Sequence, residues 1–130
     1  MNEVKKKIES FTDLYTWQEG HKFVVQIYEM TKSLPANEVY GLRSQMQRAA
    51  VSITSNIAEG FSRRTFTDKA HFYYMAKGSL TELQNQLLIA RDVGYISNEI
   101  FDELAEQSRA TYQLLAGLIR ATKDNDRREI

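Results

Sequence analysis

The stretch from Tyr40 to Phe61 constrains the fold of this 130-residue chain more than any other. Its apolar positions recur with helical spacing, but alanine, serine and medium-sized aliphatic residues fill most of them, as in the run Arg48–Ile53. Small side chains at a helix contact shorten the distance between the two axes. The stretch therefore predicts a helix that other helices approach closely, which defines architecture far better than activity.

Three further segments have helical periodicity. The first should end before Pro35, because the proline ring disfavours a helical conformation at the preceding residue. Four helices with short connections predict an all-α, antiparallel up-down-up-down four-helix bundle. The apolar stripes of these segments are Leu14, Trp17, His21, Val24, Tyr28 and Thr31 beside Phe23, Ile27, Met30 and Leu34; then Tyr73, Ala76, Leu80, Leu83, Leu87 and Ala90; and finally Ile100, Leu104, Thr111, Leu114 and Leu118 beside Phe101, Ala105, Tyr112, Leu115 and Ile119.

The helix within the opening stretch is expected to run from about Glu38 or Tyr40 to Ala58, with Gly60 ending it. Its inward positions are Leu42, Met46, Ala49 or Ala50, Ile53 and Ile57.

The remaining helix ends follow from capping residues and glycines. Thr65 or Thr67 is expected to cap the third helix, Gly94 to close it, and Ser97 to cap the fourth. Gly78 lies inside the third helix, where glycine costs about 1 kcal/mol relative to alanine. A neighbouring backbone packed against Gly78 would explain why that cost is tolerated.

The chain divides into three parts. Residues 1–10 are expected to form a flexible N-terminal arm, residues 11–123 the bundle domain, and residues 124–130 a frayed tail, because the composition becomes polar after Lys123.

The doubled stripes of the first and fourth helices exceed what an isolated bundle needs. Either the core is unusually wide, or a second face meets another subunit. Exposed aromatic side chains, expected at Phe23, Phe72 and Phe101, favour self-association with closed symmetry.

Composition excludes several classes of protein. The chain has no cysteine, so it has neither a disulfide framework nor a thiolate metal site, which fits a cytoplasmic protein. No secretory signal is visible, and no run of about 18 apolar residues could span a membrane. Lysine plus arginine equals aspartate plus glutamate at 17 each, so the whole molecule has no net attraction for nucleic acid or membrane.

The charges are unevenly distributed along this neutral chain. The segment Val39–Leu80 has six basic residues and two acidic ones, whereas Asp92–Ser108 has five acidic residues and no basic one. Such runs usually solvate an outer face. The alternative is a basic edge that binds RNA or DNA weakly, since bases interleave there with aromatic residues. The residues of that edge are Arg43, Arg63, Arg64 and Lys69.

Motifs for catalysis or metal binding are sparse. The chain has no Gly-x-Ser-x-Gly elbow and no glycine-rich phosphate loop. Asp68 and His71 lie one helical turn apart, but a carboxylate-bridged metal centre needs two Glu-x-x-His pairs and further carboxylates. We therefore expect no catalytic residue, no metal and no cofactor.

A polar stripe follows the second helix. The residues that recur there at helical spacing, and that could meet Glu82 on the third helix, are Arg48, Ser52, Ser55, Asn56 and Glu59. This set is either functional, as a recognition pocket or a polar lining at the axis of a ring, or a satisfied network that sets the register of the helices. The network is the commoner case.

The chain also resembles a family of bacterial four-helix-bundle proteins, the 23S rRNA-intervening sequence proteins, over roughly residues 14–121. The residues that carry the resemblance are Trp17, Ile27-Tyr28, Leu34-Pro35, Glu38, Tyr40-Gly41-Leu42, Ser44-Gln45, Arg48-Ala49-Ala50-Val51-Ser52-Ile53, Ser55-Asn56-Ile57-Ala58-Glu59-Gly60, Arg63, Ala76, Gly78-Ser79-Leu80, Glu82-Leu83 and Gly94-Tyr95. The resemblance implies a ring-forming bundle, pentameric where seen, with no established enzymatic role. Accessory proteins of diversity-generating retroelements are similar, but their strongly basic surface is absent from this neutral chain.

These observations favour a non-enzymatic, oligomeric helical-bundle protein that acts as a binding or scaffold protein, with itself as its first partner. The alternative is an accessory protein that binds RNA or DNA through the basic edge. Salt dependence separates the two functions, because phosphate binding weakens steeply with ionic strength.

Overall fold

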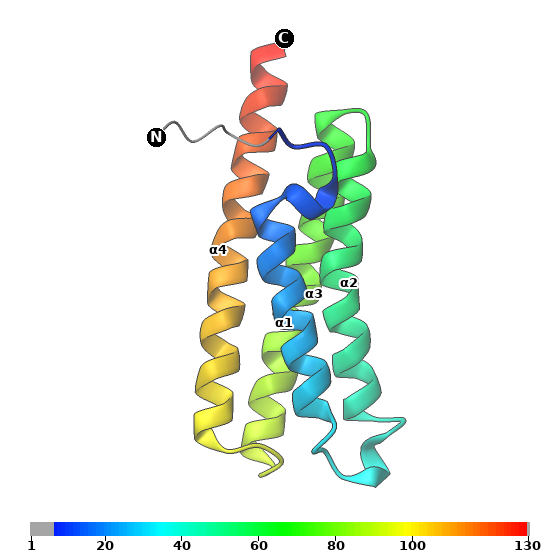
Figure 1. Ribbon diagram of the computed structural model, residues 1–130, viewed down its shortest axis with the longest axis vertical. Helices are drawn as coiled ribbons and strands as arrows, with labels where there is room; N and C mark the ends of the chain where they lie inside the picture. Colours follow the sequence, from blue (N-terminus) through cyan, green and yellow to red (C-terminus); the bar gives the residue numbers. More distant parts are fainter. Residues whose placement is uncertain (1–6, 130) are drawn as a thin grey trace.

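Figure 1 shows the computed structural model of the protein, which describes the backbone of residues 7–129 and the side chains of residues 7–126. Within that range the regular elements are four α-helices and two 3₁₀ turns, with no strand, so the all-α prediction is confirmed. The helices are α1 (Tyr15–Thr31), α2 (Leu42–Ser62), α3 (Phe66–Asp92) and α4 (Asn98–Glu129), and the turns are η1 (Phe11–Asp13) and η2 (Ala36–Glu38).

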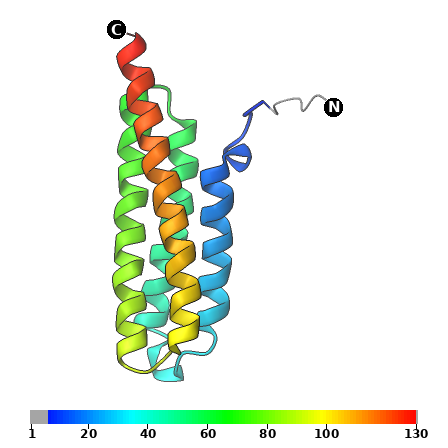
Figure 2. The same cartoon turned by 90° about the vertical axis from the view of Figure 1, so that its left-hand side faces the viewer.

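The four helices lie side by side along the long axis of the molecule (Figure 1, Figure 2). The α1–α2 and α3–α4 connections lie at one end, and the α2–α3 connection lies at the other (Figure 1). Each helix contacts the next along the chain, and α1 also contacts α4. α1 and α3 do not contact each other and therefore lie diagonally across the core.

The core is a single cluster to which all four helices contribute. The stripe predicted for α3 is buried along its whole length, from Tyr73 to Ala90. The inward positions predicted for α2 are buried too, except Leu42, which is partly buried against the cluster. Both helices have one inward stripe in their sequence, which leaves no ambiguity about the buried face. The fully buried large apolar side chains are Phe23, Ile27, Met46, Ile53, Ile57, Leu80, Leu83, Leu87 and Leu115.

In α1 the structure corrects the prediction for Phe23. This ring is fully buried at the centre of the core, not exposed. The inward face combines the stripe from Phe23 through Ile27 and Met30 with Val24 and Thr31 of the other stripe, whereas His21 and Tyr28 of that other stripe are exposed. Phe72 and Phe101, the other two aromatic residues expected at the surface, are partly buried.

The inward face of α4 runs between the two predicted stripes and includes hydroxyl residues. Ser108, Thr111 and Thr122 are buried, and each donates to a backbone carbonyl of the preceding turn at 2.8–3.0 Å. Polar side chains thus enter the core without losing their hydrogen bonds. α4 continues to Glu129, so residues 124–129 are helical where the sequence predicts a frayed tail. Residues 1–6 of the expected N-terminal arm lie outside the described residues.

The predicted ends of α2 are wrong at both sides. The helix begins at Leu42 and continues to Ser62, so Gly60 lies in its last turn and does not end it. Gly60 is buried, and a Cβ atom there would lie 2.6 Å from Cε1 of Tyr73 on α3. This glycine therefore allows a close contact between α2 and α3. The prediction that Gly60 ends α2 is wrong.

The predicted helix caps are confirmed. The Thr65 hydroxyl accepts from the backbone N–H of Asp68 at 3.1 Å, and the Ser97 hydroxyl accepts from that of Ile100 at 3.1 Å. Gly94, with φ of +84°, turns the chain after α3. Gly78 differs from the prediction, because no atom lies within 4 Å of the Cβ that it lacks. Among the described residues, no helix is long and apolar enough to cross a membrane.

Candidate functional site

The four residues of the predicted basic edge do not form one surface. Arg43 lies in the first turn of α2, whereas Arg63 and Arg64 follow its last turn. The helix between them is about 30 Å long at 1.5 Å per residue. Arg43 is therefore separated from the other three cations by the length of the bundle.

The Lys69 ammonium forms hydrogen bonds with backbone carbonyl groups of its own chain. It donates to the carbonyl oxygen of Phe61 at 2.6 Å and, more weakly, to that of Gly60 at 3.4 Å. It also lies 5.4 Å from the centre of the Phe61 ring. Burial lowers the pKa of this ammonium. Lys69 satisfies carbonyl groups at the end of α2, which favours a cation there, and it is poorly placed to meet a phosphate.

Arg63 and Arg64 lie in the α2–α3 connection. Arg63 forms an ion pair with Glu59 at 3.2 Å, and its guanidinium carbon lies 4.4 Å from the centre of the Phe72 ring. Both partners of this pair are about half exposed, so the pair contributes little to stability. Arg64 is exposed. Arg64 is thus the member of the predicted edge that presents its charge most openly.

The structure joins only part of the predicted polar stripe, and its partner on α3 is Ser79, which the prediction did not assign to it. Asn56 donates to the backbone oxygen and the hydroxyl of Ser52 at 2.8 and 3.0 Å. The Ser52 hydroxyl lies 2.8 Å from that of Ser79 on α3. The i, i+4 spacing of Ser52 and Asn56 is the signal in the sequence for the first of these contacts. The result is a small hydrogen-bonded link between α2 and α3.

The other predicted members of that stripe lie at the surface. Arg48 and Glu82 are exposed, and Glu82 accepts a hydrogen bond from Gln86 of its own helix at 3.3 Å. Glu59 is the partner of Arg63. The Ser52–Ser79 link therefore has the geometry of an inter-helix contact and not that of a recognition pocket.

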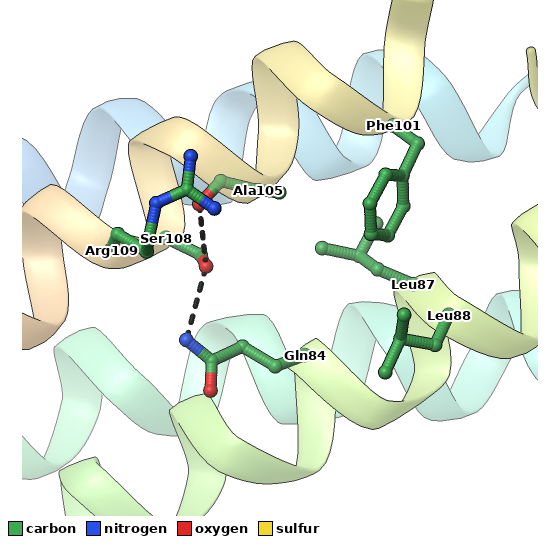
Figure 3. Close-up of a pocket in the computed structure, with 7 residues that line it drawn as sticks. All are labelled: Gln84, Leu87, Leu88, Phe101, Ala105, Ser108 and Arg109. Carbon is green, nitrogen blue, oxygen red and sulfur yellow. Dashed lines mark hydrogen bonds between the residues drawn. The ribbon is translucent and has the colours of Figure 1, made fainter. Parts of the chain in front are cut away.

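The α3–α4 cleft, shown in Figure 3, has a polar and an apolar end. Gln84 donates to the hydroxyl of Ser108 at 3.1 Å, and Ser108 donates to the carbonyl of Ala105 at 3.0 Å (Figure 3). The Arg91 guanidinium lies 4.4 Å from the centre of the Phe101 ring. The volume of the cleft is about 160 Å³, small for a ligand site. Its lining residues are Gln84, Leu87, Leu88, Phe101, Ala105, Ser108 and Arg109.

The two histidines contact aromatic rings. His71, paired with Asp68 in the sequence analysis, is exposed and meets Phe72 edge to face, with ring centres 5.6 Å apart. His21 stacks on Trp17 at 4.7 Å. Within the described part of the chain, no group of three histidine, cysteine, aspartate or glutamate residues could hold a metal ion.

The outward face of α3 carries large apolar side chains. Tyr74, Met75, Ile89 and Val93 are 46%, 39%, 42% and 56% exposed. They form two pairs on the side of α3 opposite to its buried seam. Tyr74 and Met75 lie near the exposed Gly78, and Ile89 and Val93 lie at the end of the helix, with the exposed Glu82 and Asn85 between the pairs. We call the four apolar residues the α3 outer face. Large apolar side chains exposed on the outward side of a helix are typical of an interaction surface.

Comparisons with known proteins agree with this fold. A crystal structure of a protein of unknown function from the S23 ribosomal protein family of Bacteroides thetaiotaomicron superimposes with a TM-score of 0.75 at 22% sequence identity. The match covers 80% of this chain and 97% of that one. A comparison with curated proteins finds no match. The model of the 23S rRNA-intervening sequence protein family matches residues 12–117, nearly the whole bundle. The chain therefore belongs to the 23S rRNA-intervening sequence protein family.

Proposed function

We propose that this chain is the subunit of a closed homo-oligomer, in which antiparallel up-down-up-down bundles form a ring that acts as a non-enzymatic binding scaffold. Five subunits are favoured by the resemblance to the family, and the cysteine-free sequence is in keeping with a cytoplasmic assembly. The observation that carries the proposal is the α3 outer face. Four large apolar side chains on one helix face would be left in water in a monomer.

A second exposed surface lies on the diagonally opposite helix. Tyr15, Val25 and Tyr28 of α1 are 61%, 55% and 41% exposed. Because α1 and α3 do not contact each other, the two surfaces lie on different sides of the bundle. Contact between two different surfaces of neighbouring subunits is heterologous, and a heterologous contact closes into a ring when the rotation between subunits permits it.

Light scattering coupled to size exclusion tests this assembly. The parent protein should have a mass several times the 15.1 kDa of the chain, with fivefold expected. Ile89→Glu introduces a charge into the α3 outer face and should shift the mass towards that of the single chain, because an unpaired charge in an apolar interface is costly. Gln113→Glu adds the same charge at an exposed position of α4 and should leave the mass unchanged. A monomeric parent protein would contradict the proposal.

The alternative function, RNA or DNA binding at the basic edge, has less support. Lys69 is engaged by carbonyl groups, Arg63 is paired with Glu59, and Arg43 lies at the other end of α2. A ring would repeat the exposed Arg64 around one end and so raise a weak affinity through multivalency. That repetition is the remaining argument for the alternative, and it depends on the proposed assembly.

A further inference from the structure

A second cleft lies between α1 and α4, towards the end of the bundle that holds the α1–α2 and α3–α4 connections. Its volume is about 390 Å³, within the usual range of ligand-binding clefts. Met30 and Leu104 are buried at its base, and Ile100 is 41% exposed. Its remaining lining residues are Gln26, Glu29, Ser33 and Glu103.

Hydrogen bonds join α1 and α4 above this cleft. Gln107 donates to the backbone oxygen of Glu19 at 3.3 Å, and Thr16 donates to the backbone oxygen of Leu114 at 3.4 Å. Both bridges lie nearer to the start of α1 than the cleft does. The two helices are thus tied along their upper parts, and they leave an apolar cleft between them below.

Carboxylates surround this apolar base. Glu29 and Glu103 line the cleft, and the exposed Glu99 and Glu106 lie one turn before and after Glu103. Lys32 offsets one of these charges through an ion pair with Glu29 at 3.0 Å. From the start of α4 to Ser108 the sequence holds four acidic residues and no basic one. The α4 side of the cleft is therefore negative, whereas α1 also carries Lys32 and the exposed Lys22.

The helix dipole explains only one of these charges, that of Glu99. A carboxylate in the first turn of a helix is stabilised by the helix dipole, and Glu99 occupies that turn. The effect falls off within one turn, so it does not account for Glu103 or Glu106. Like charges four residues apart on a helix, such as Glu99 and Glu103, destabilise it. The stability of the helix thus gains nothing from carboxylates at these two positions.

The polar groups of the cleft mostly accept hydrogen bonds. The carboxylates are acceptors, and Oε1 of Gln26 is buried without a hydrogen-bond partner in the structure. The Ser33 hydroxyl already donates to the carbonyl of Met30 at 2.7 Å. A complementary occupant has to bring donors with positive charge, together with an apolar group for the base.

We infer that the α1–α4 cleft docks a basic amphipathic helix of a partner protein. Its aliphatic or aromatic anchor packs on Met30, Ile100 and Leu104, and its lysine or arginine side chains meet Glu99, Glu103 and Glu106. Successive carboxylates are one turn apart, about 5–6 Å, and the three span positions i, i+4 and i+7 of α4, which matches cations on three successive turns of a partner helix. The same carboxylates repel phosphates, which disfavours nucleic acid. The inference rests on the proposed scaffold function, because it names the kind of protein that the scaffold binds. The cleft itself lies within a single chain and does not depend on the assembly.

The test is fluorescence anisotropy with full-length protein and a labelled synthetic peptide. The peptide spans about four helical turns, about 14 residues, with leucines on one face and lysines on the other. Saturable binding that weakens with added salt is expected. Glu103→Lys and Ile100→Asp should each weaken binding by about tenfold, equivalent to 1.4 kcal/mol.

Asp102→Lys is the matched control. It makes the same charge change one residue earlier on the same helix, at an exposed position outside the cleft, so it alters long-range attraction equally. Its affinity for the peptide should stay within about twofold of the parent protein, because a charge outside the docking surface contributes little to affinity. Circular dichroism of each variant checks that the fold is kept.

Three outcomes would overturn the inference. The first is an equal loss of peptide affinity in Glu103→Lys and Asp102→Lys, which would mean that the overall charge of the protein attracts the peptide and the cleft does not bind it. The second is equal binding of a peptide with glutamate in place of lysine, or displacement of the lysine peptide by single-stranded RNA. The third is a lower assembly mass in Glu103→Lys, which would mean that a second copy fills the cleft. Peptide binding by a monomeric protein would refute the proposed assembly alone.

Discussion

The two sides of α3 meet very different surroundings. Towards α2, Tyr73 packs against Gly60 and the hydroxyls of Ser79 and Ser52 are linked, so volume and hydrogen bonds are both satisfied within the chain. On the α3 outer face, Tyr74 and Met75 lie in the open near Gly78, and nothing packs against that glycine. The contrast shows that a small residue on a helix does not by itself indicate a close helix contact, because its role depends on which atoms lie opposite it.

The largest expected effect is at Gly60. Gly60→Ala places a methyl group 2.6 Å from the Tyr73 ring, so α2, α3 or the ring must shift. We expect the free energy of unfolding to fall by about 1–3 kcal/mol, as in other overpacked cores. Denaturant unfolding followed by circular dichroism measures it. An unchanged midpoint would mean that the α2–α3 contact is looser than the structure shows.

Gly78→Ala is the opposite test on the same helix. The added methyl group meets no atom of the chain, and alanine favours a helix by about 1 kcal/mol over glycine. The free energy of unfolding should therefore rise by about 1 kcal/mol in the same assay. A fall in stability together with a lower assembly mass would show that a neighbouring subunit approaches closely at Gly78.

The Ser52–Ser79 link should have a smaller effect. Ser79→Ala removes one partner, but the Ser52 hydroxyl still accepts from Asn56, so we expect a loss of about 0.5–1 kcal/mol. Thr81→Ala is the control, since its exposed hydroxyl donates only to the carbonyl of Lys77 on the same helix. Unfolding curves of the two variants should differ. If both match the parent protein, the link does not stabilise the α2–α3 contact.

The smallest effect is expected in the connections at the opposite end of the bundle from Gly60. Tyr95 donates to Glu38 at 2.8 Å, and this bond, with burial and the carboxylate charge, raises the pKa of the Tyr95 phenol above its usual value near 10. A raised folded-state pKa stabilises the fold below pH about 10, and the stabilisation is lost as pH rises through the folded value.

Tyr95→Phe should therefore be less stable than the parent protein near neutral pH, and the difference should shrink above pH about 10. Thermal unfolding at several pH values measures both. A difference that stays constant to high pH would contradict the proposed role of the bond.

The sequence predicts α3 and the interior of α2 well because each has one inward stripe. It fails for α1 and α4, where two adjacent stripes leave the inward direction open, and so Phe23 was expected at the surface. The prediction for Gly60 fails because a single sequence does not distinguish a glycine that ends a helix from one that leaves room for a neighbouring ring. Distinguishing them requires the position of Tyr73, 13 residues further along.

The candidate site is harder to predict, because a sequence shows which residues carry charge but not how far apart they lie. Arg43 and Arg63 are separated by a helix that the sequence does indicate, so their separation could have been foreseen. The role of Lys69 could not, because its contact with the Phe61 carbonyl depends on how the chain turns between α2 and α3. The α1–α4 cleft has no signature beyond the acidic run, since its base comes from residues about 70 positions apart.

The length of α4 has a consequence for local dynamics. Thr122 is the last buried residue that the structure describes in this helix, which continues for seven more residues, about 10 Å. In both views this segment rises past the turn between α2 and α3 (Figure 1, Figure 2). Amide hydrogen exchange should therefore be slow around Leu115 and fast after Lys123, so that one continuous helix contains a steep gradient of opening free energy. A fluorophore or fused domain attached there would report on tumbling of the bundle without disturbing its core.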